Sequence, residues 1–470
     1  MIKALIMAAD SAMPEYLIDK RELFPTLGHM VETGASGGYS AYVQKGYNGS
    51  YSTEQNWSSI YTGLAPSEHG ITTNKLPEMR SFDDLLPFWQ VLNQSGLTVG
   101  IWAAHCLKSP IPISGYVVSC KYETIDTPDE NRISPRILQF SEPWLHGYFD
   151  KEPPPRLYPK TLAQQGYTFE TLKHNRELAE EAVAKYHYQD SLTNFEEELQ
   201  YWFDSIVRVQ SKHPVDVLYL YTPSTDLIAH CCMCSDDNDV LIEAYKLLDK
   251  YLGKLIEQLS PEMTVFLSDH GQQNFRDLIK CSDESVSREA FTARDDVIWL
   301  KNGYIAFEAH NGALLFTAHA LKGTFIASGS GIRHTMINEM RSIDIYPTLL
   351  EIFGARIPPG RKGYVADIFD RPVVNGDKLF NKSAIVRKNI ALIQTHSMNL
   401  MDIFINELYI ENRFSHITIV GEPKYEEIFC NNPRVSGFMP IEVYNYQYYD
   451  EVYCGFYNET TKYMRHIRVK

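Results

Sequence analysis

The chain has 470 residues, of which 44% are hydrophobic, so it is long enough for a large buried core and an additional small module. Its formal net charge of -15 excludes a general electrostatic attraction to duplex nucleic acid or to an anionic membrane surface. No apolar stretch has the length of a transmembrane helix, and the first residues do not resemble a secretory signal. We therefore expect a cytoplasmic protein with reduced cysteines and no membrane partner.

Short, continuous apolar runs along the first three quarters of the chain predict strands of a buried parallel sheet: Lys3–Ala8, Thr98–Ala103, Val215–Tyr221, Thr264–Leu267 and Gly323–Ala327. Apolar residues at helical spacing predict helices between them: Pro25–Thr33, Phe82–Ser95, Asp239–Leu259 and Arg341–Phe353. This alternation of strands and helices indicates a layered α/β fold with a mostly parallel central sheet.

Two regions depart from that alternation. Residues 104–210 contain the proline-rich stretch Glu152–Arg156 and a long polar helical region at about Glu170–Val209. We expect this segment to be an insertion that caps the sheet or its site. From about Phe380 onward, tyrosine-rich segments such as His416–Val420 and Glu442–Tyr449 predict strands of a small α+β module. The expected domains are therefore 1–375, which would carry the catalytic site, and a C-terminal module, 376–470.

Carboxylates and imidazoles lie beside the ends of the predicted strands: Asp10, Asp226 with His230, Asp269 with His270, and His319. Each alone has a common structural explanation as a helix cap, a turn residue or a buried core histidine. Together they predict a site, because polar groups at successive strand ends converge on one edge of an α/β sheet. Asp226 and His230 are four residues apart, which places both on one face of a helical turn. Aspartate and histidine suit zinc, with manganese or iron as alternatives.

A further candidate is the segment that begins at Thr53. Thr53 opens a predicted helix that also carries Asn56 and Trp57. A hydroxyl at a helix N-terminus, beside free backbone N–H groups, is well placed to hold a phosphate, and a helix-capping role for Thr53 is compatible with that function. Trp57 is a candidate for stacking on a ring of the substrate.

These motifs resemble the type I phosphodiesterase/nucleotide pyrophosphatase branch of the alkaline phosphatase superfamily over about residues 1–370. The matching patterns are Thr53-x-x-Asn56, Thr62-Gly63-x-x-Pro66-x-x-His69-Gly70-Ile71, Asp226-x-x-x-His230, Ser268-Asp269-His270-Gly271, and His319 four residues before Gly323. Glu54-Gln55 replaces the Phe-Pro that the family carries after its threonine. The resemblance implies an alkaline-phosphatase-like α/β/α sandwich.

The resemblance also implies two divalent metal ions, Zn²⁺ or alternatively Mn²⁺ or Fe. It assigns one ion to Asp226, His230 and His319, and the other to Asp10, Thr53, Asp269 and His270. Thr53 would be the nucleophile that forms a threonyl-phosphate intermediate. Asn56 would bind the substrate phosphate and stabilise charge on its oxygens.

The expected substrate is a small phosphate ester or nucleotide-like compound, and a diester is favoured. The stretch from Asn48 to Thr73 contains no lysine or arginine, so nothing there balances the additional charge of a monoester. One alternative is a phosphomonoesterase or a phosphotransferase or mutase of the same superfamily, with the cation supplied by Lys108, Lys121 or Arg156. The other is a non-catalytic protein that binds phosphate compounds on this scaffold. The oligomeric state cannot be derived from these patterns.

Overall fold

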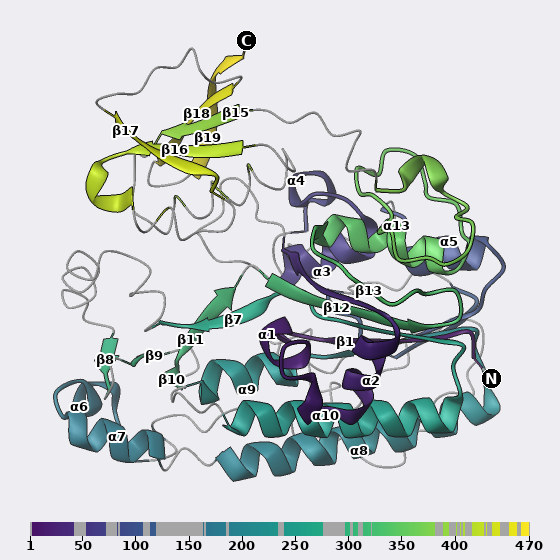
Figure 1. Cartoon of the computed structure of the whole chain (residues 1–470). Coiled ribbons are helices and arrows are strands. Elements are labelled where there is room, and N and C mark those ends of the chain that lie inside the picture. Colours follow the sequence, from purple (N-terminus) through teal and green to yellow (C-terminus); the bar gives the residue numbers. More distant parts are fainter. Residues whose placement is uncertain are drawn as a thin grey trace.

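Figure 1 shows the computed structural model of the chain. The structure describes residues 2–41, 53–71, 82, 85–106, 113–118, 163, 166–184, 188–233, 239–275, 297–300, 304–308, 314–320 and 322–380. Toward the C-terminus it describes residues 389–393, 401, 405, 408, 416–426, 429, 435–441, 451–457 and 462–469.

The largest element of the fold is a nine-stranded sheet in the order β13-β2-β12-β6-β1-β5-β3-β4, with β14 also paired to β2. Its strands are β1 (Ala4–Ala9), β2 (Ala35–Ser40), β3 (Val99–Trp102), β4 (Gly115–Val118), β5 (Val217–Thr222), β6 (Met263–Leu267), β12 (Lys322–Gly329), β13 (Thr335–Met336) and β14 (Met340–Arg341). The central strand β1 is buried along its whole length, because helices cover both faces of the sheet and both sets of side chains must be apolar.

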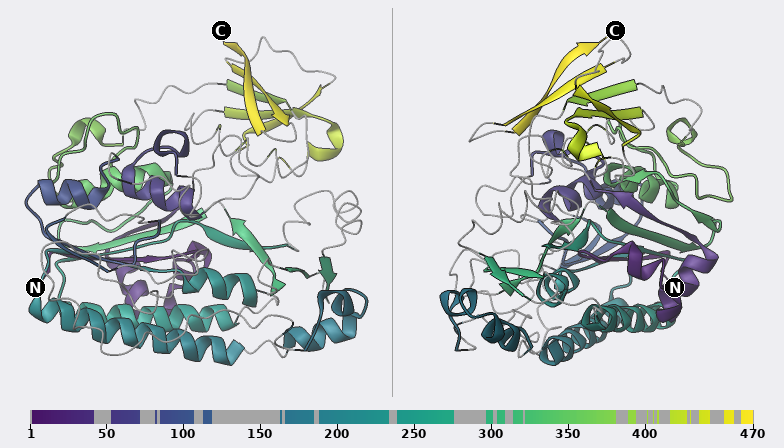
Figure 2. Two further views of the ribbon diagram at one scale, coloured as in Figure 1. Left: turned by 180° about the vertical axis from the view of Figure 1, so that it is seen from behind. Right: turned by 60° about the vertical axis from the view of Figure 1, so that its left-hand side comes forward.

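Helices form one layer on each side of this sheet (Figures 1 and 2). One layer contains α2 (Pro25–Thr33), α8 (Tyr188–Lys212), α9 (Ser224–Cys232) and α10 (Asp239–Leu259). The other contains α3 (Thr53–Thr62), α4 (Pro66–His69), α5 (Phe88–Gln94) and α13 (Ser342–Ile352). The predicted α/β/α sandwich with a mostly parallel sheet is confirmed.

All five predicted strands exist, but the expected direction of the last one was wrong. The run Gly323–Ala327 lies in β12, which is antiparallel to both of its neighbours, β2 and β6. An apolar run reports burial on both faces and carries no information on direction. The sequence also failed to predict β2, whose residues Ala-Ser-Gly-Gly-Tyr-Ser lack an apolar run. Small residues are needed there, because a Cβ on Gly37 would lie 2.0 Å from the carbonyl oxygen of Ile337.

The predicted helices are found with small changes in their bounds. Pro25–Thr33 and Asp239–Leu259 are observed as α2 and α10 without change, and the last predicted helix is α13. The helix expected at Phe82–Ser95 starts only at Phe88, after Pro87. Leu86 has a φ of 49°, a left-handed conformation that no right-handed helix can include.

Two parts of the segment 104–210 belong to the layers themselves. β4 is the edge strand that pairs with β3, and α8 packs against α10 beneath the sheet. Between them, α6 (Phe169–Lys173) and α7 (Arg176–Ala184) contact β8 (Val297–Trp299). The stretch Glu152–Arg156 lies outside the described residues. A capping role for this region stays a prediction.

Residues beyond 388 form a second sheet of five strands in the order β17-β16-β15-β18-β19. The strands are β15 (Asn389–Ile393), β16 (His416–Gly421), β17 (Gly437–Pro440), β18 (Glu451–Tyr457) and β19 (Lys462–Val469). Ile390, Leu392, Ile417 and Ile419 pack in a hydrophobic cluster separate from the main core. The predicted strand at His416 is therefore confirmed, whereas Glu442–Tyr449 lies outside the described residues. A domain boundary near residue 375 stays a prediction.

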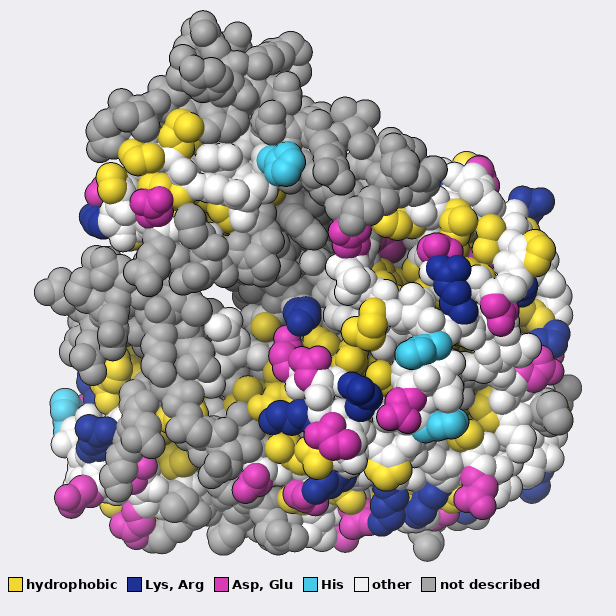
Figure 3. Space-filling model, viewed as in Figure 1, with side chains coloured by type: hydrophobic (Ala, Val, Ile, Leu, Met, Phe, Trp, Pro, Cys, Tyr) yellow, Lys and Arg dark blue, Asp and Glu magenta, His cyan; other side chains and the backbone are white. Residues whose placement is uncertain are grey.

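The described surface in Figure 3 carries lysine, arginine, aspartate and glutamate side chains that are intermingled. Within the part of the chain that the structure describes, no helix combines the length and the apolar character needed to cross a bilayer.

Candidate active site

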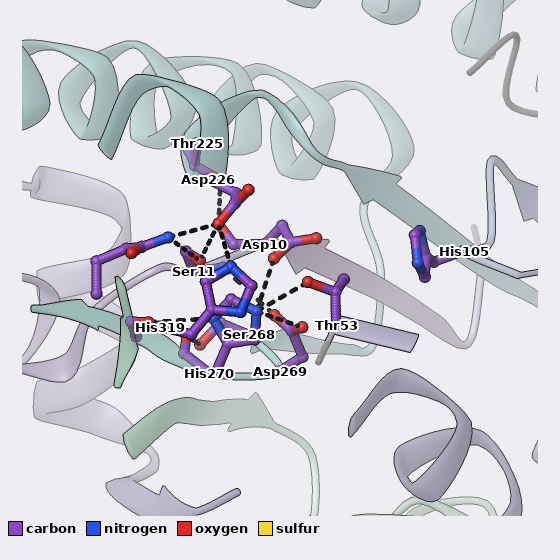
Figure 4. A network of polar contacts seen from close by, with 12 residues as sticks. Asp10, Ser11, Thr53, His105, Thr225, Asp226, Ser268, Asp269, His270 and His319 are labelled. Carbon is purple, nitrogen blue, oxygen red and sulfur yellow. Dashed lines mark hydrogen bonds and ion pairs between the residues drawn. The ribbon is translucent and has the colours of Figure 1, made fainter. Parts of the chain in front are cut away.

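The side chains that the sequence singled out converge beside the ends of the central strands (Figure 4). Strands β5, β1 and β6 are adjacent and parallel, so the residues that follow them meet at one edge. Asp10 follows β1, Asp226 and His230 lie on α9 after β5, and Asp269 and His270 follow β6. His319 lies on β11 (Thr317–Ala320), which pairs with β7 (Gly271–Asn274), and Thr53 is the first residue of α3.

One group of potential ligand atoms surrounds the imidazole of His270. Its Nε2 atom lies 3.0 Å from the hydroxyl oxygen of Thr53, 3.1 Å from Oδ2 of Asp269 and 3.5 Å from Oδ1 of Asp10. These two carboxylate oxygens are buried and accept no hydrogen bond from the described residues. Buried charged oxygens normally have hydrogen-bond or metal partners, so a cation between them fits this arrangement.

A second group surrounds Asp226. Its Oδ1 atom lies 3.4 Å from Nε2 of His230 and 3.6 Å from Nε2 of His319, and these two nitrogens are 3.0 Å apart. The ring of His319 also stacks on that of His270, with centroids 3.9 Å apart. Ligand atoms of Asp226, His270 and His319 lie within 4.8 Å of one another, as do those of Asp10, Asp269 and His270. Geometrically, His270 therefore adjoins both groups, and the division into two ligand sets stays a prediction.

The tautomers of two histidines follow from their backbone contacts. Nδ1 of His230 lies 3.1 Å from the carbonyl oxygen of Thr317, and Nδ1 of His270 lies 3.1 Å from that of Gly271. A carbonyl oxygen only accepts hydrogen bonds, so each Nδ1 carries the proton. Each Nε2 lone pair is then left to face the cluster, which is the arrangement that metal-ligating histidines require.

The carboxyl groups are buried where an uncompensated negative charge is unfavourable. Burial and the neighbouring Asp226 raise the pKa of Asp10 from 3.8 to about 8. Burial and Asp10 raise the pKa of Asp269 well above its usual range. Burial alone would also raise the pKa of Asp226, but the nearby imidazoles lower it overall. A cation in the cluster would favour the ionised form of all three carboxyls.

The imidazoles of His230 and His270 are held in the neutral form that binds metals. Burial lowers the pKa of His270 well below its ordinary 6.5, and burial also lowers the pKa of His230. Neutral imidazoles beside the carboxylate oxygens of Asp10 (Oδ1) and Asp269 (Oδ2), which have no hydrogen-bond partner among the described residues, form a donor set suited to divalent cations.

The other candidate residues, Asn56 and Trp57, both lie on α3. Asn56 is buried on α3, one turn after Thr53. Trp57 is fully buried, stacked on Tyr61 and edge-on to Tyr221 with centroids 5.8 and 5.3 Å away. The indole therefore packs between α3 and the sheet, and a contact between Trp57 and the substrate stays a prediction. Lys108, Lys121 and Arg156 lie outside the described residues.

Sequence reasoning missed four residues that contact the predicted ligands. Tyr221 donates a hydrogen bond to Oδ2 of Asp10 at 2.6 Å, and the Gln272 amide donates to Oδ1 of Asp226 at 2.6 Å. The hydroxyl of Thr317 accepts from Nδ1 of His230 at 3.0 Å, and the hydroxyl of Ser11 donates to Oδ1 of Asp226 at 2.6 Å. Ser11, Gln272 and Thr317 lie within two residues of a predicted ligand in the sequence. That position alone does not predict a contact, because serine, threonine and glutamine are common beside such motifs.

The family model of the type I phosphodiesterases/nucleotide pyrophosphatases matches residues 4–313. Human ectonucleotide pyrophosphatase/phosphodiesterase 5 is 16% identical with a TM-score of 0.44, over 77% of this chain and 97% of that one. An inactive variant of the murine protein in complex with AMP is 14% identical with a TM-score of 0.42, over 76% and 96%. The alkaline phosphatase PafA is 13% identical with a TM-score of 0.45, over 77% and 98%. No curated protein sequence matches the chain. Since the family model matches more than half of the chain, the protein belongs to the type I phosphodiesterase/nucleotide pyrophosphatase family and is a phosphoester hydrolase.

Proposed function

We propose that this enzyme is a metal-dependent phosphodiesterase that works through a threonyl-phosphate intermediate on Thr53. The observation that carries the proposal is the position of the Thr53 hydroxyl. It begins α3 and lies 3.0 Å from Nε2 of His270, facing the cluster of Asp10 and Asp269 (Figure 4). A hydroxyl so placed can approach a phosphorus atom held at the start of the helix, where backbone N–H groups attract phosphate oxygens.

The proposed ligands form two sets. Asp226, His230 and His319 would hold one divalent ion, and Asp10, Thr53, Asp269 and His270 would hold the other. Zn²⁺ suits these ligands, and Mn²⁺ or Fe are alternatives. When bound, such ions lower the pKa of a coordinated hydroxyl and neutralise charge on phosphoryl oxygens.

The reaction then follows from the chain's own groups. The Thr53 oxygen forms a bond to phosphorus while the bond from phosphorus to the leaving oxygen breaks, and the departing alcohol takes a proton. Water next attacks the threonyl phosphate, which releases a phosphate monoester and restores the Thr53 hydroxyl. Asn56 lies three positions after Thr53 on the same helix, where side chains share a face. We assign its amide as a donor to a phosphoryl oxygen during both steps.

The proposed substrate is a small phosphate diester or a nucleotide-like compound, in agreement with the family of the chain. No lysine or arginine lies between residues 48 and 73, so that segment supplies no positive side chain for the additional charge of a monoester. A phosphomonoesterase or phosphotransferase activity is the alternative, and it would need a cation from elsewhere in the chain.

The nucleophile is tested with Thr53→Ala and Thr53→Ser. We expect Thr53→Ala to fold and to lower kcat by roughly a thousandfold or more, because the covalent route is closed. Thr53→Ser should retain part of the activity. Ser59→Ala is a matched control. It removes a hydroxyl from the same helix, but that hydroxyl is hydrogen-bonded to His69 and not to a residue of the cluster. Turnover of Thr53→Ala near that of wild type would show that Thr53 only begins the helix and that water attacks phosphorus directly.

A further inference from the structure

Ser11 occupies an unfavourable backbone conformation next to a predicted ligand. It directly follows Asp10, is fully buried and has a φ of 57°. This left-handed conformation suits glycine, and it destabilises a residue with a side chain. Strain of this kind persists where the surrounding structure requires that residue. A serine at this position therefore indicates that its hydroxyl makes contacts that glycine could not make.

The hydroxyl of Ser11 joins the two groups of the cluster. It donates a hydrogen bond to Oδ1 of Asp226 at 2.6 Å. Its oxygen lies 2.9 Å from Nδ1 of His270, whose proton is fixed there by the Gly271 carbonyl, so it accepts from that histidine. The Gln272 amide donates to the same oxygen at 3.1 Å. One hydroxyl thus uses its donor and both acceptor positions, and all its partners are buried or partly buried.

These contacts reach a residue of each proposed ligand set. His270 belongs to the set with Asp10 and Asp269, and Asp226 belongs to the set with His230 and His319. The backbone N–H of Ser11 also donates to Oδ1 of Asp269 at 3.3 Å. Partners of metal ligands orient the ligand and tune its basicity. A residue that orients one ligand in each set should affect the binding of both ions.

We propose that Ser11 is a positioning residue shared by both metal sites. This inference rests on the proposed two-metal function. Hydrogen bonding to Ser11 holds the His270 ring so that Nε2 faces Asp10 and Asp269, and it holds the Asp226 carboxylate toward His230 and His319. Tyr221 offers a contrast, because among the proposed ligands its hydroxyl donates only to Asp10. Ser11 therefore serves both ions, whereas Tyr221 serves one.

The test is calorimetric titration of the metal-free full chain with Zn²⁺, with a competing chelator so that both dissociation constants are resolved. We expect Ser11→Ala to weaken both constants by about tenfold or more, the usual effect of losing a partner of a metal ligand. Tyr221→Phe, which also removes one buried hydroxyl, should weaken only one. If Ser11→Ala changes one constant or neither, the inference is overturned while the two-metal proposal stands. A wild-type chain that binds fewer than two ions overturns both.

Ser11→Gly separates the hydroxyl from the backbone. Alanine keeps the Cβ atom and hence the unfavourable φ, whereas glycine removes both the hydroxyl and the strain. If the hydroxyl positions the ligands, Ser11→Gly should bind Zn²⁺ as weakly as Ser11→Ala. If Ser11→Gly binds both ions as tightly as wild type, the hydroxyl has no positioning role and the proposal fails.

Discussion

Asp10 provides a sharp test of the electrostatics of the site, because its carboxyl group is buried beside two other carboxyls. In the absence of metal, its pKa of about 8 lies far above the ordinary value of 3.8. Between these values the folded protein keeps a proton that the unfolded chain releases. The stabilisation that this proton provides is fully present below pH 3.8 and is lost as the pH rises through 8. We therefore expect Asp10→Asn, which cannot ionise, to be less sensitive to pH than the wild-type chain.

The window for the measurement follows from the histidines. The pKa values of His230 and His270 are lowered, so these groups add stability as the pH rises toward 6.5 and nothing further above it. Between pH 6.5 and 8, the carboxyls with raised pKa values therefore dominate the contribution of the cluster to the pH dependence of the free energy of unfolding. One proton changes the free energy of unfolding by 1.36 kcal/mol per pH unit, so Asp10 lowers that free energy by about 2 kcal/mol across this window. The raised pKa of Asp269 acts in the same direction.

The assay is urea unfolding with chelator present at pH 6.5, 7.2 and 8.0. We expect the free energy of unfolding of the wild type to fall relative to that of Asp10→Asn by about 2 kcal/mol from the first pH to the last. The amide of the variant still accepts the Tyr221 hydrogen bond, so packing is retained. Asp216→Asn is the control, since hydrogen bonds from Thr98 hold the pKa of Asp216 below its ordinary value, despite some burial, and that group stays ionised throughout the window. Parallel pH profiles for wild type and Asp10→Asn would refute the reasoning.

Two further predictions concern metals and substrate. Protein purified without chelator should contain about two divalent ions per chain by elemental analysis. Removing them should abolish hydrolysis, and activity that persists in a metal-free sample would contradict the two-metal proposal. In a panel of a nucleotide aryl diester, the matching aryl monoester, a bis-aryl diester and a sulfate ester, we expect the nucleotide diester to give a much higher kcat/KM than the monoester. A large preference for the monoester would instead support a phosphomonoesterase and would direct mutagenesis to Lys108, Lys121 and Arg156.

The candidate site was largely predictable because its residues follow local rules. Apolar runs reveal buried strands, and polar residues at their ends meet at one sheet edge whatever the details of packing. The four-residue spacing of Asp226 and His230 likewise places them together on α9 without tertiary information. These patterns, with the resemblance that they carry, were enough to find Asp10, Thr53, Asp269, His270 and His319 as neighbours in space.

The partners of those residues were decided only by the tertiary structure. Ser11 meets His270 across 259 positions and meets Asp226 across 215 positions. The strand-end rule brings these segments to one edge of the sheet, but it does not determine which of their side chains form hydrogen bonds with one another. Strand direction and side-chain burial are also decided by the tertiary structure. β12 runs antiparallel because of the strands beside it, and Trp57 is buried because Tyr221 and other core residues pack against it. Periodicity within a segment records whether that segment is buried, but the identity of its neighbour depends on how distant parts of the chain fold together.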